Sequence, residues 1–170
     1  MTENSTRIDV LIRGGTLVDG TGSRPVSGDV AIAGNKIVEV GGKIEASGAE
    51  VIDADGAVVA PGWVDIHTHY DGQVAWDDTL DPSFSNGVTT FVMGNCGVGF
   101  APYRDGDEQA LMDVMEGVED IPGTALAEGV PWGAWNTFEQ YLDYIGERSY
   151  SMDFGAQLPH SALRLQVMGE

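Results

Sequence analysis

The chain has 170 residues, and its 42% hydrophobic and 21% charged content is that of an ordinary globular protein. Asp and Glu number 27 against 8 Lys and Arg, which gives a formal charge of −19 at pH 7. Such an acidic surface repels phosphate groups and anionic lipids, which argues against nucleic acids and membranes as partners. A single cysteine excludes an internal disulfide, and the polar N-terminus lacks the apolar core of a signal peptide. No apolar segment approaches the roughly 18 residues that span a bilayer, so we expect a cytoplasmic protein.

The first part of the chain, residues 1–60, is predicted to form a small β-rich domain. Gly34-Asn35 predicts a hairpin between the apolar segments on either side, because both residues tolerate positive φ. A second hairpin is predicted around Asp55-Gly56, which would join Val51-Ile52 to residues 57–60. The segment has little apolar mass, so we expect it to pack against another part of the protein.

Beyond Pro61-Gly62 the pattern changes to longer apolar strands. The segment 88–93 is β-branched and almost continuously apolar, which is typical of a strand in a parallel sheet. Two further strands are predicted at 63–69 and 152–158, the last of them ending at Pro159.

Amphipathic helices are predicted between these strands. From Asp107 onward, apolar residues recur at three- and four-residue spacing, which indicates a helix with one buried face. A second helix is predicted over 137–147, with Asn136 as its N-cap and Glu139 closing a capping box. Strands that alternate with helices predict an α/β fold with a parallel sheet.

The first of these strands ends in the triplet His67-Thr68-His69. Side chains alternate along a strand with period two, so Asp65, His67 and His69 are expected on one face. Two neighbouring imidazoles suit zinc or a similar divalent cation, and Asp65 would orient a ring N–H from behind. The alternative is a His-x-His that occurs by chance or serves packing.

Two more candidate residues follow the second and third strands. Because the carboxyl ends of parallel strands meet at one edge of a sheet, His67, His69, Cys96 and His160 should share that edge. Cys96 would be a thiolate ligand of the same cation, or otherwise a small buried hydrophobic residue. His160 would contact a substrate, or otherwise be a hydrogen-bonded loop histidine.

The pattern Pro-Gly-x-x-Asp-x-His-x-His over Pro61–His69 resembles the opening signature of the metal-dependent amidohydrolase superfamily. Upstream, Gly14–Gly22 resembles the start of the small β-domain, of the β-sandwich type, that precedes the barrel in that superfamily. Downstream, Gly94-Asn-Cys-Gly97 and Pro159–Arg164 are similar to the N-acyl-D-amino-acid deacylase (D-aminoacylase) branch. In that branch a cysteine at the position of Cys96 is a metal ligand.

The resemblance implies a (β/α)8 barrel with a zinc centre of one or two ions that hydrolyses the linear amide bond of small N-acyl amino acids. Two further histidine ligands, and an aspartate that acts as the general base, would lie beyond residue 170. A barrel takes about 250 residues, so residues 61–170 would supply only its first three β/α units, and this chain alone would be an inactive, truncated portion.

Two alternatives stay open. A cyclic-amide hydrolase of the hydantoinase or dihydroorotase kind shares the His-x-His strand, although Cys96 counts against it. A non-catalytic structural fragment is the other alternative, and its open sheet edge would favour self-association.

Overall fold

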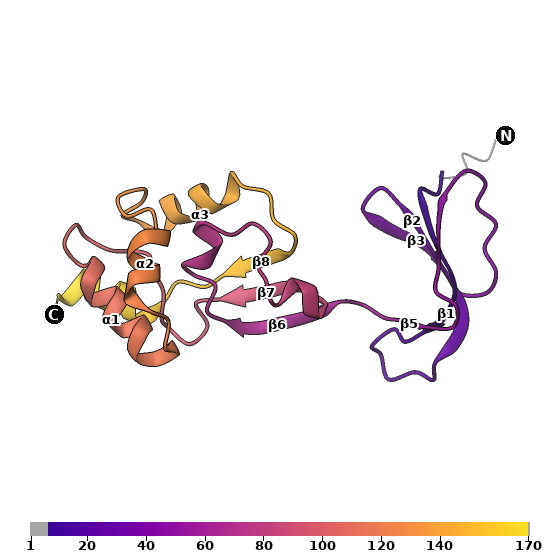
Figure 1. The fold of residues 1–170 in the computed structure, drawn as a ribbon, viewed down its shortest axis with the longest axis horizontal. Helices are drawn as coiled ribbons and strands as arrows, with labels where there is room; N and C mark the ends of the chain where they lie inside the picture. Colours follow the sequence, from indigo (N-terminus) through magenta and orange to yellow (C-terminus); the bar gives the residue numbers. More distant parts are fainter. Residues whose placement is uncertain (1–6, 170) are drawn as a thin grey trace. The chain divides into compact units, whose positions relative to one another are not determined.

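The computed structural model describes residues 7–169 and divides the chain into two compact units, Met1–Pro61 and Gly62–Glu170 (Figure 1). Across residues 7–169, no helix has the length and apolar character needed to cross a membrane.

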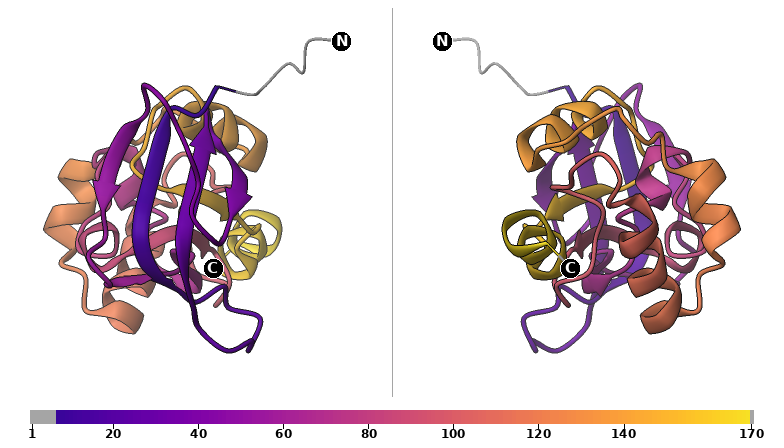
Figure 2. Two further views of the ribbon diagram at one scale, coloured as in Figure 1. Left: turned by 90° about the vertical axis from the view of Figure 1, so that its right-hand side faces the viewer. Right: turned by 90° about the vertical axis from the view of Figure 1, so that its left-hand side faces the viewer.

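The first unit, called the β unit below, is a mixed five-stranded sheet. Strands β3, β2, β1 and β4 lie side by side in that order, and β5 pairs with the end of β1 (Figure 2). The strands are β1 (Val10–Leu17), β2 (Val26–Ala33), β3 (Lys36–Val40), β4 (Glu50–Asp53) and β5 (Val58–Val59). β2 and β3 form the antiparallel hairpin predicted at Gly34-Asn35.

The second predicted hairpin is wrong. Asp55 and Gly56 do form a turn with positive φ values of 44° and 79°, but β4 and β5 do not pair with each other. Both lie parallel to β1 instead, with β4 beside its first half and β5 beside its second half. The edge of the long strand β1 has free backbone N–H and C=O groups. Both short strands form their backbone hydrogen bonds along this edge, and both run parallel to β1.

The core of the β unit is small and includes one carboxyl group. Leu11, Ala31 and Ile44 are buried together, and Asp29 is only 4% exposed. The two carboxyl oxygens of Asp29 accept hydrogen bonds from the backbone N–H groups of Gly14 (2.8 Å) and Ile44 (2.9 Å). The Ile44 and Gly14 N–H groups lower the pKa of Asp29, because they favour its charged form. This carboxylate of β2 therefore ties strand β1 and the loop after β3 to each other.

The second unit, called the α/β unit below, contains a parallel three-stranded sheet in the order β6-β7-β8. Its elements are β6 (Trp63–Thr68), η1 (Gln73–Ala75), η2 (Phe84–Asn86), β7 (Val88–Met93), α1 (Glu108–Glu119), α2 (Gly123–Gly129), α3 (Phe138–Gly146), β8 (Asp153–Ala156) and α4 (His160–Met168). The prediction of a mixed α/β unit with parallel strands is confirmed. Two short 3-10 helices lie between β6 and β7, and three α-helices lie between β7 and β8.

Two helix starts differ from the prediction. The N-cap of α3 is Thr137, whose hydroxyl accepts from the backbone of Gln140, so the capping box lies one residue later than Asn136 and Glu139 would place it. His160, expected in a loop, is the first residue of α4. Pro159 has a φ of −69°, which suits the start of a helix, where its missing N–H is not needed.

Aromatic side chains dominate the core of the α/β unit. Trp135 is 1% exposed and donates its indole N–H to the carbonyl oxygen of Phe100 at 2.8 Å. Trp132 packs edge-on against Phe100 and Tyr103. Both tryptophans therefore serve packing, the default expected for such residues.

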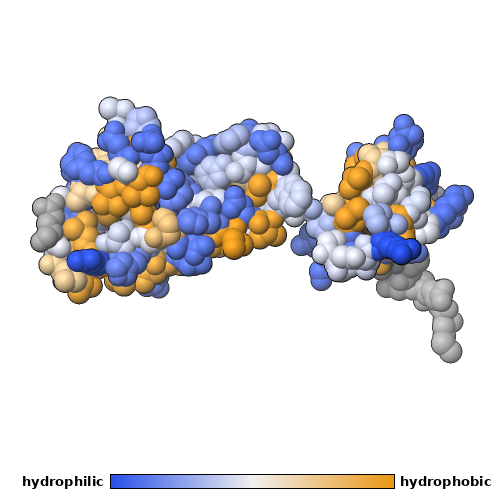
Figure 3. Space-filling model, turned by 90° about the horizontal axis from the view of Figure 1, so that it is seen from below, coloured by the Kyte–Doolittle hydropathy of each residue, from blue (hydrophilic) through white to orange (hydrophobic). Residues whose placement is uncertain are grey.

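Strand β6 carries apolar side chains at the surface of the α/β unit. Trp63, Val64 and Ile66 are between 61% and 71% exposed, whereas Phe91 and Met93 of the neighbouring β7 are fully buried. Apolar patches are also visible at the surface of both units in Figure 3.

Candidate metal centre

The carboxyl ends of β6, β7 and β8 lie at one edge of the sheet. The register pairs Thr68 of β6 with Met93 of β7, and Met93 with Ala156 of β8. His67 is the second-last residue of β6 and His69 directly follows the strand, with their ring centroids 5.5 Å apart. The two imidazoles therefore neighbour each other, as the period-two pattern requires.

Cys96 lies in a tight turn after β7 that depends on glycine. Gly94 and Gly97 have φ values of 78° and 90°, and the N–H of Gly97 donates to the carbonyl oxygen of Gly94 at 3.0 Å. A Cβ on Gly94 would lie 2.3 Å from the carbonyl oxygen of Gln157, so no larger residue fits there. The amide of Asn95 donates to the carbonyl oxygen of Ile66 at 2.8 Å and ties the turn to β6. The Gly-Asn-Cys-Gly sequence thus brings the thiol of Cys96 next to the end of β6.

His67, His69 and Cys96 form one cluster of possible metal ligands. One donor atom from each lies within 4.8 Å of the other two, and Sγ of Cys96 is 3.8 Å from Nδ1 of His69. Tetrahedral zinc, with bonds of about 2.0–2.3 Å, separates its nitrogen and sulfur ligands by roughly 3.3–3.8 Å. Two imidazoles and a thiol at this spacing fit a zinc-type cation in both chemistry and geometry.

The carboxylate that contacts an imidazole is Glu119. Its Oε1 lies 3.0 Å from Nε2 of His69, and the two side chains are 30% and 16% exposed. Asp65, expected in this role, instead accepts a hydrogen bond from the backbone N–H of His67 at 3.1 Å. Glu119 comes from the last turn of α1, fifty residues after His69, and sequence reasoning missed it.

Asp71, two residues after His69, is a second acidic residue of interest, and it is buried rather than exposed on a loop. The residue is 3% exposed, and its backbone carbonyl accepts from the hydroxyl of Tyr141 at 2.8 Å. Among residues 7–169, its Oδ2 has no hydrogen-bond partner. Burial raises the pKa of Asp71 to about 7, because the charged form is poorly solvated.

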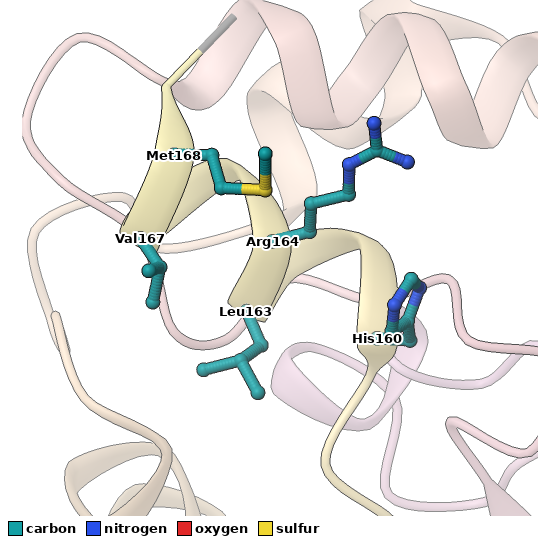
Figure 4. A pocket seen from close by; sticks show the side chains of 5 residues that line it. All are labelled: His160, Leu163, Arg164, Val167 and Met168. Carbon is teal, nitrogen blue, oxygen red and sulfur yellow. The ribbon is translucent and has the colours of Figure 1, made fainter.

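His160 lies beside the Cys96 turn but outside the cluster of possible metal ligands. A Cβ on Gly97 would lie 3.3 Å from Cβ of His160, and the backbone N–H of Ser161 donates to the carbonyl oxygen of Gly97 at 2.8 Å. His160 and Arg164 line an open hollow of about 430 Å³ on α4 (Figure 4). The four candidate residues thus belong to one edge of the sheet, and three of them share a single cluster.

Comparison with known proteins identifies the family. A model described as "Amidohydrolase family" matches residues 50–170. The D-aminoacylase of Alcaligenes xylosoxydans xylosoxydans is 32% identical over 165 residues, which is 97% of this chain and 32% of that protein. The chain therefore spans about a third of the length of this curated relative.

Solved structures give the same result. A D-aminoacylase structure, whose study concerns a binuclear metal centre, superposes with a TM-score of 0.78 at 34% identity and covers 96% of this chain and 32% of that one. An N-acyl-D-glutamate deacylase from Bordetella bronchiseptica, complexed with zinc and a phosphonate inhibitor, has a TM-score of 0.74 at 28% identity over the same shares. The sequence match over most of the chain, together with these likenesses, shows that the chain belongs to the amidohydrolase family.

Proposed function

We propose that this chain contributes the first part of a zinc-dependent amidohydrolase that cleaves the linear amide bond of N-acyl-D-amino acids. The observation that carries the proposal is the cluster of His67, His69 and Cys96 at the carboxyl edge of a parallel sheet. The names of the relatives, D-aminoacylase and N-acyl-D-glutamate deacylase, supply the substrate class, a small N-acyl amino acid.

The proposal includes a domain organisation. Residues 1–60 would be the N-terminal part of a small β-domain, and residues 61–170 the first β/α units of a (β/α)8 barrel. Support comes from the order β6-β7-β8, in which strands successive in the chain are neighbours and parallel. Active sites of such barrels lie at the carboxyl ends of the strands, the edge at which the cluster lies.

In the proposed site, His67, His69 and Cys96 hold the ion, and the glycine turn around Cys96 fixes the position of the thiolate. Bound zinc would polarise the amide carbonyl and make a water molecule nucleophilic at neutral pH. His160, beside the same turn, is proposed to contact the substrate. Residues 1–170 contain only three histidines, so the remaining ligands and an aspartate base are proposed to come from other residues of the enzyme.

The test is release of free amino acid from N-acetyl-D-amino acids by the intact enzyme with added zinc. N-acetyl-L-amino acids and hydantoins serve as comparison substrates. We expect hydrolysis of the D-enantiomers, loss of turnover with a chelator, and a loss in the Cys96→Ser variant. A polypeptide of residues 1–170 alone should release nothing, because misplacing catalytic groups by about 1 Å already costs on the order of a hundredfold.

Two outcomes would contradict the proposal. Turnover of hydantoins with none of N-acetyl-D-amino acids would favour a cyclic-amide hydrolase. Undiminished turnover by the Cys96→Ser variant would remove Cys96 from the active site.

A further inference from the structure

The turn that carries Cys96 is approached closely by two other segments of the chain. A Cβ on Gly99, at the end of the turn, would lie 2.5 Å from Cγ of Pro159, in the segment between β8 and α4. The same Cβ would lie 2.8 Å from Oδ1 of Asp71, in the segment between β6 and η1. Gly99 does not have a positive φ, so its missing side chain makes room for these neighbours rather than for a special backbone conformation.

The carboxyl group of Asp71 also faces the start of the turn. Burial raises the pKa of Asp71, and the backbone N–H groups of Asp71 and Gly94 oppose that rise, because an N–H that faces a carboxylate favours its charged form. Gly94 precedes Cys96 in the sequence, and Gly99 follows it. One buried carboxyl group therefore meets the turn at both of its ends.

The stability of the core does not explain an acidic residue at this position. Asp71 is 3% exposed, and its Oδ2 has no hydrogen-bond partner among residues 7–169, which is costly for a buried carboxyl group. Its backbone is held in place, because the hydroxyl of Tyr141 on α3 donates to its carbonyl oxygen at 2.8 Å. Since Asp71 lies two residues after His69, its carboxyl group connects the segment of one candidate ligand to the turn of another.

We propose that Asp71 is a positioning residue, whose carboxyl oxygen fixes the turn after β7 so that the thiol of Cys96 lies beside His69. The proposal rests on the metal centre proposed above and adds a residue that acts through the turn rather than as a ligand. With the turn in this position, the donor atoms of the three candidate ligands lie within 4.8 Å of one another. Groups that hold metal ligands in place typically contribute about 10–100-fold to metal affinity.

The first experiment needs no metal. Hydrogen–deuterium exchange of the metal-free intact protein, followed by mass spectrometry, measures how readily the backbone of residues 94–99 opens. Asp71→Ala should accelerate exchange there by roughly 3–10-fold, the effect of losing one hydrogen-bond partner. Asp71→Asn should change it less, because its amide oxygen can still accept from the turn.

The matched control is Asp29→Ala, which removes an equally buried carboxylate from the β unit. It should leave exchange over residues 94–99 unchanged. Equal exchange over these residues in Asp71→Ala and Asp29→Ala would overturn the proposal.

The second experiment measures zinc affinity of the intact protein by competition with a chromogenic chelator. Asp71→Ala should weaken binding by about 10–100-fold, Asp71→Asn should restore most of that loss, and Asp29→Ala should have no effect. In a Cys96→Ser background, Asp71→Ala should weaken binding much less, because the turn no longer supplies a thiolate. The same fold-loss from Asp71→Ala in both backgrounds would show that Asp71 does not act through Cys96 and would overturn the proposal.

The two proposals fail in different ways. If the unaltered protein binds no zinc, or binds it equally well as Cys96→Ser, the proposed metal centre is wrong, and the metal-related role of Asp71 is wrong with it. If zinc binding depends on Cys96 but not on Asp71, the metal centre stands and the positioning role is wrong.

Discussion

The β unit and the α/β unit each bury an aspartate, and their surroundings shift the two pKa values in opposite directions. Both oxygens of Asp29 accept backbone N–H groups, which lowers its pKa. Asp71 is equally buried, but its Oδ2 has no partner among the described residues and its pKa rises to about 7. The first carboxylate holds a fold together, whereas the second lies in a loop that follows two candidate metal ligands.

The difference between the two units extends to their cores. The β unit buries a small cluster around Leu11 and exposes every residue of β3. The α/β unit buries Trp135, Tyr103 and Phe91 in one large cluster. The α/β unit thus combines a large apolar core with a carboxyl group that, within residues 7–169, has one unsatisfied oxygen, whereas the carboxylate of the β unit is satisfied by two backbone N–H groups.

The largest expected effect is on the aromatic core. Trp135→Ala should lower the free energy of unfolding of the α/β unit by about 3–5 kcal/mol, because it leaves a cavity and removes the bond to Phe100. All four tryptophans lie between residues 62 and 170, so their fluorescence during urea unfolding follows this unit alone. The control is Ile37→Ala on exposed β3 of the β unit, which is followed by circular dichroism because residues 1–61 contain no tryptophan, and it should change stability by no more than about 0.5 kcal/mol. Equal losses of unfolding free energy in Trp135→Ala and Ile37→Ala would contradict the difference between the two cores.

A smaller effect is expected at the turn that holds Cys96. Gly94→Ala should cost about 1–2 kcal/mol for its left-handed φ and about 1–3 kcal/mol more for the collision with Gln157. Gly14→Ala in the β unit also has a positive φ, but its Cβ would meet nothing within 4 Å, so only the first cost applies. Urea unfolding of both variants measures the difference. A Gly94→Ala variant no less stable than Gly14→Ala would show that the turn is not tightly packed.

The smallest expected effect is the acid dependence of the β unit. The pKa of Asp29 is lower in the folded state than its ordinary value of 3.8, so its stabilising contribution is present above pH 3.8 and is lost as the pH falls through the lower folded value. In circular dichroism titrations, Asp29→Asn should reduce the dependence of the stability of the β unit on pH below 3.8. Glu39→Gln on exposed β3 should leave that dependence unchanged. If the pH dependence of stability is the same in Asp29→Asn as in the unaltered protein, the Asp29 carboxylate does not cause it.

Local patterns predicted the elements that carry the candidate site. The β-branched run at 88–93 and the alternation before His67 require nothing beyond neighbouring residues, and both strands form where they were expected. Cys96 was expected at the same sheet edge as the two histidines, and its thiol lies beside His69.

What the sequence did not predict depends on partners distant in the chain. The pairing of β4 and β5 with β1 is set by which strand edge is free, and the turn at Asp55-Gly56 does not encode that choice. Glu119 contacts His69 because the last turn of α1 lies beside the end of β6 in the fold. The sequence near Glu119 shows only an acidic residue in the last turn of a helix, which does not predict this contact. The burial of Asp71 had no local sign.

The most direct test of His67, His69 and Cys96 as zinc ligands is X-ray absorption spectroscopy of the zinc-loaded intact protein. Two variants are compared with it. Cys96→Ser removes the only sulfur that the cluster offers, and His160→Gln changes the neighbouring histidine outside the cluster. We predict a sulfur neighbour at about 2.3 Å and nitrogen neighbours at about 2.0–2.1 Å. The sulfur shell should vanish in Cys96→Ser and persist in His160→Gln. A zinc ion with no sulfur neighbour in the unaltered protein would contradict the proposed centre.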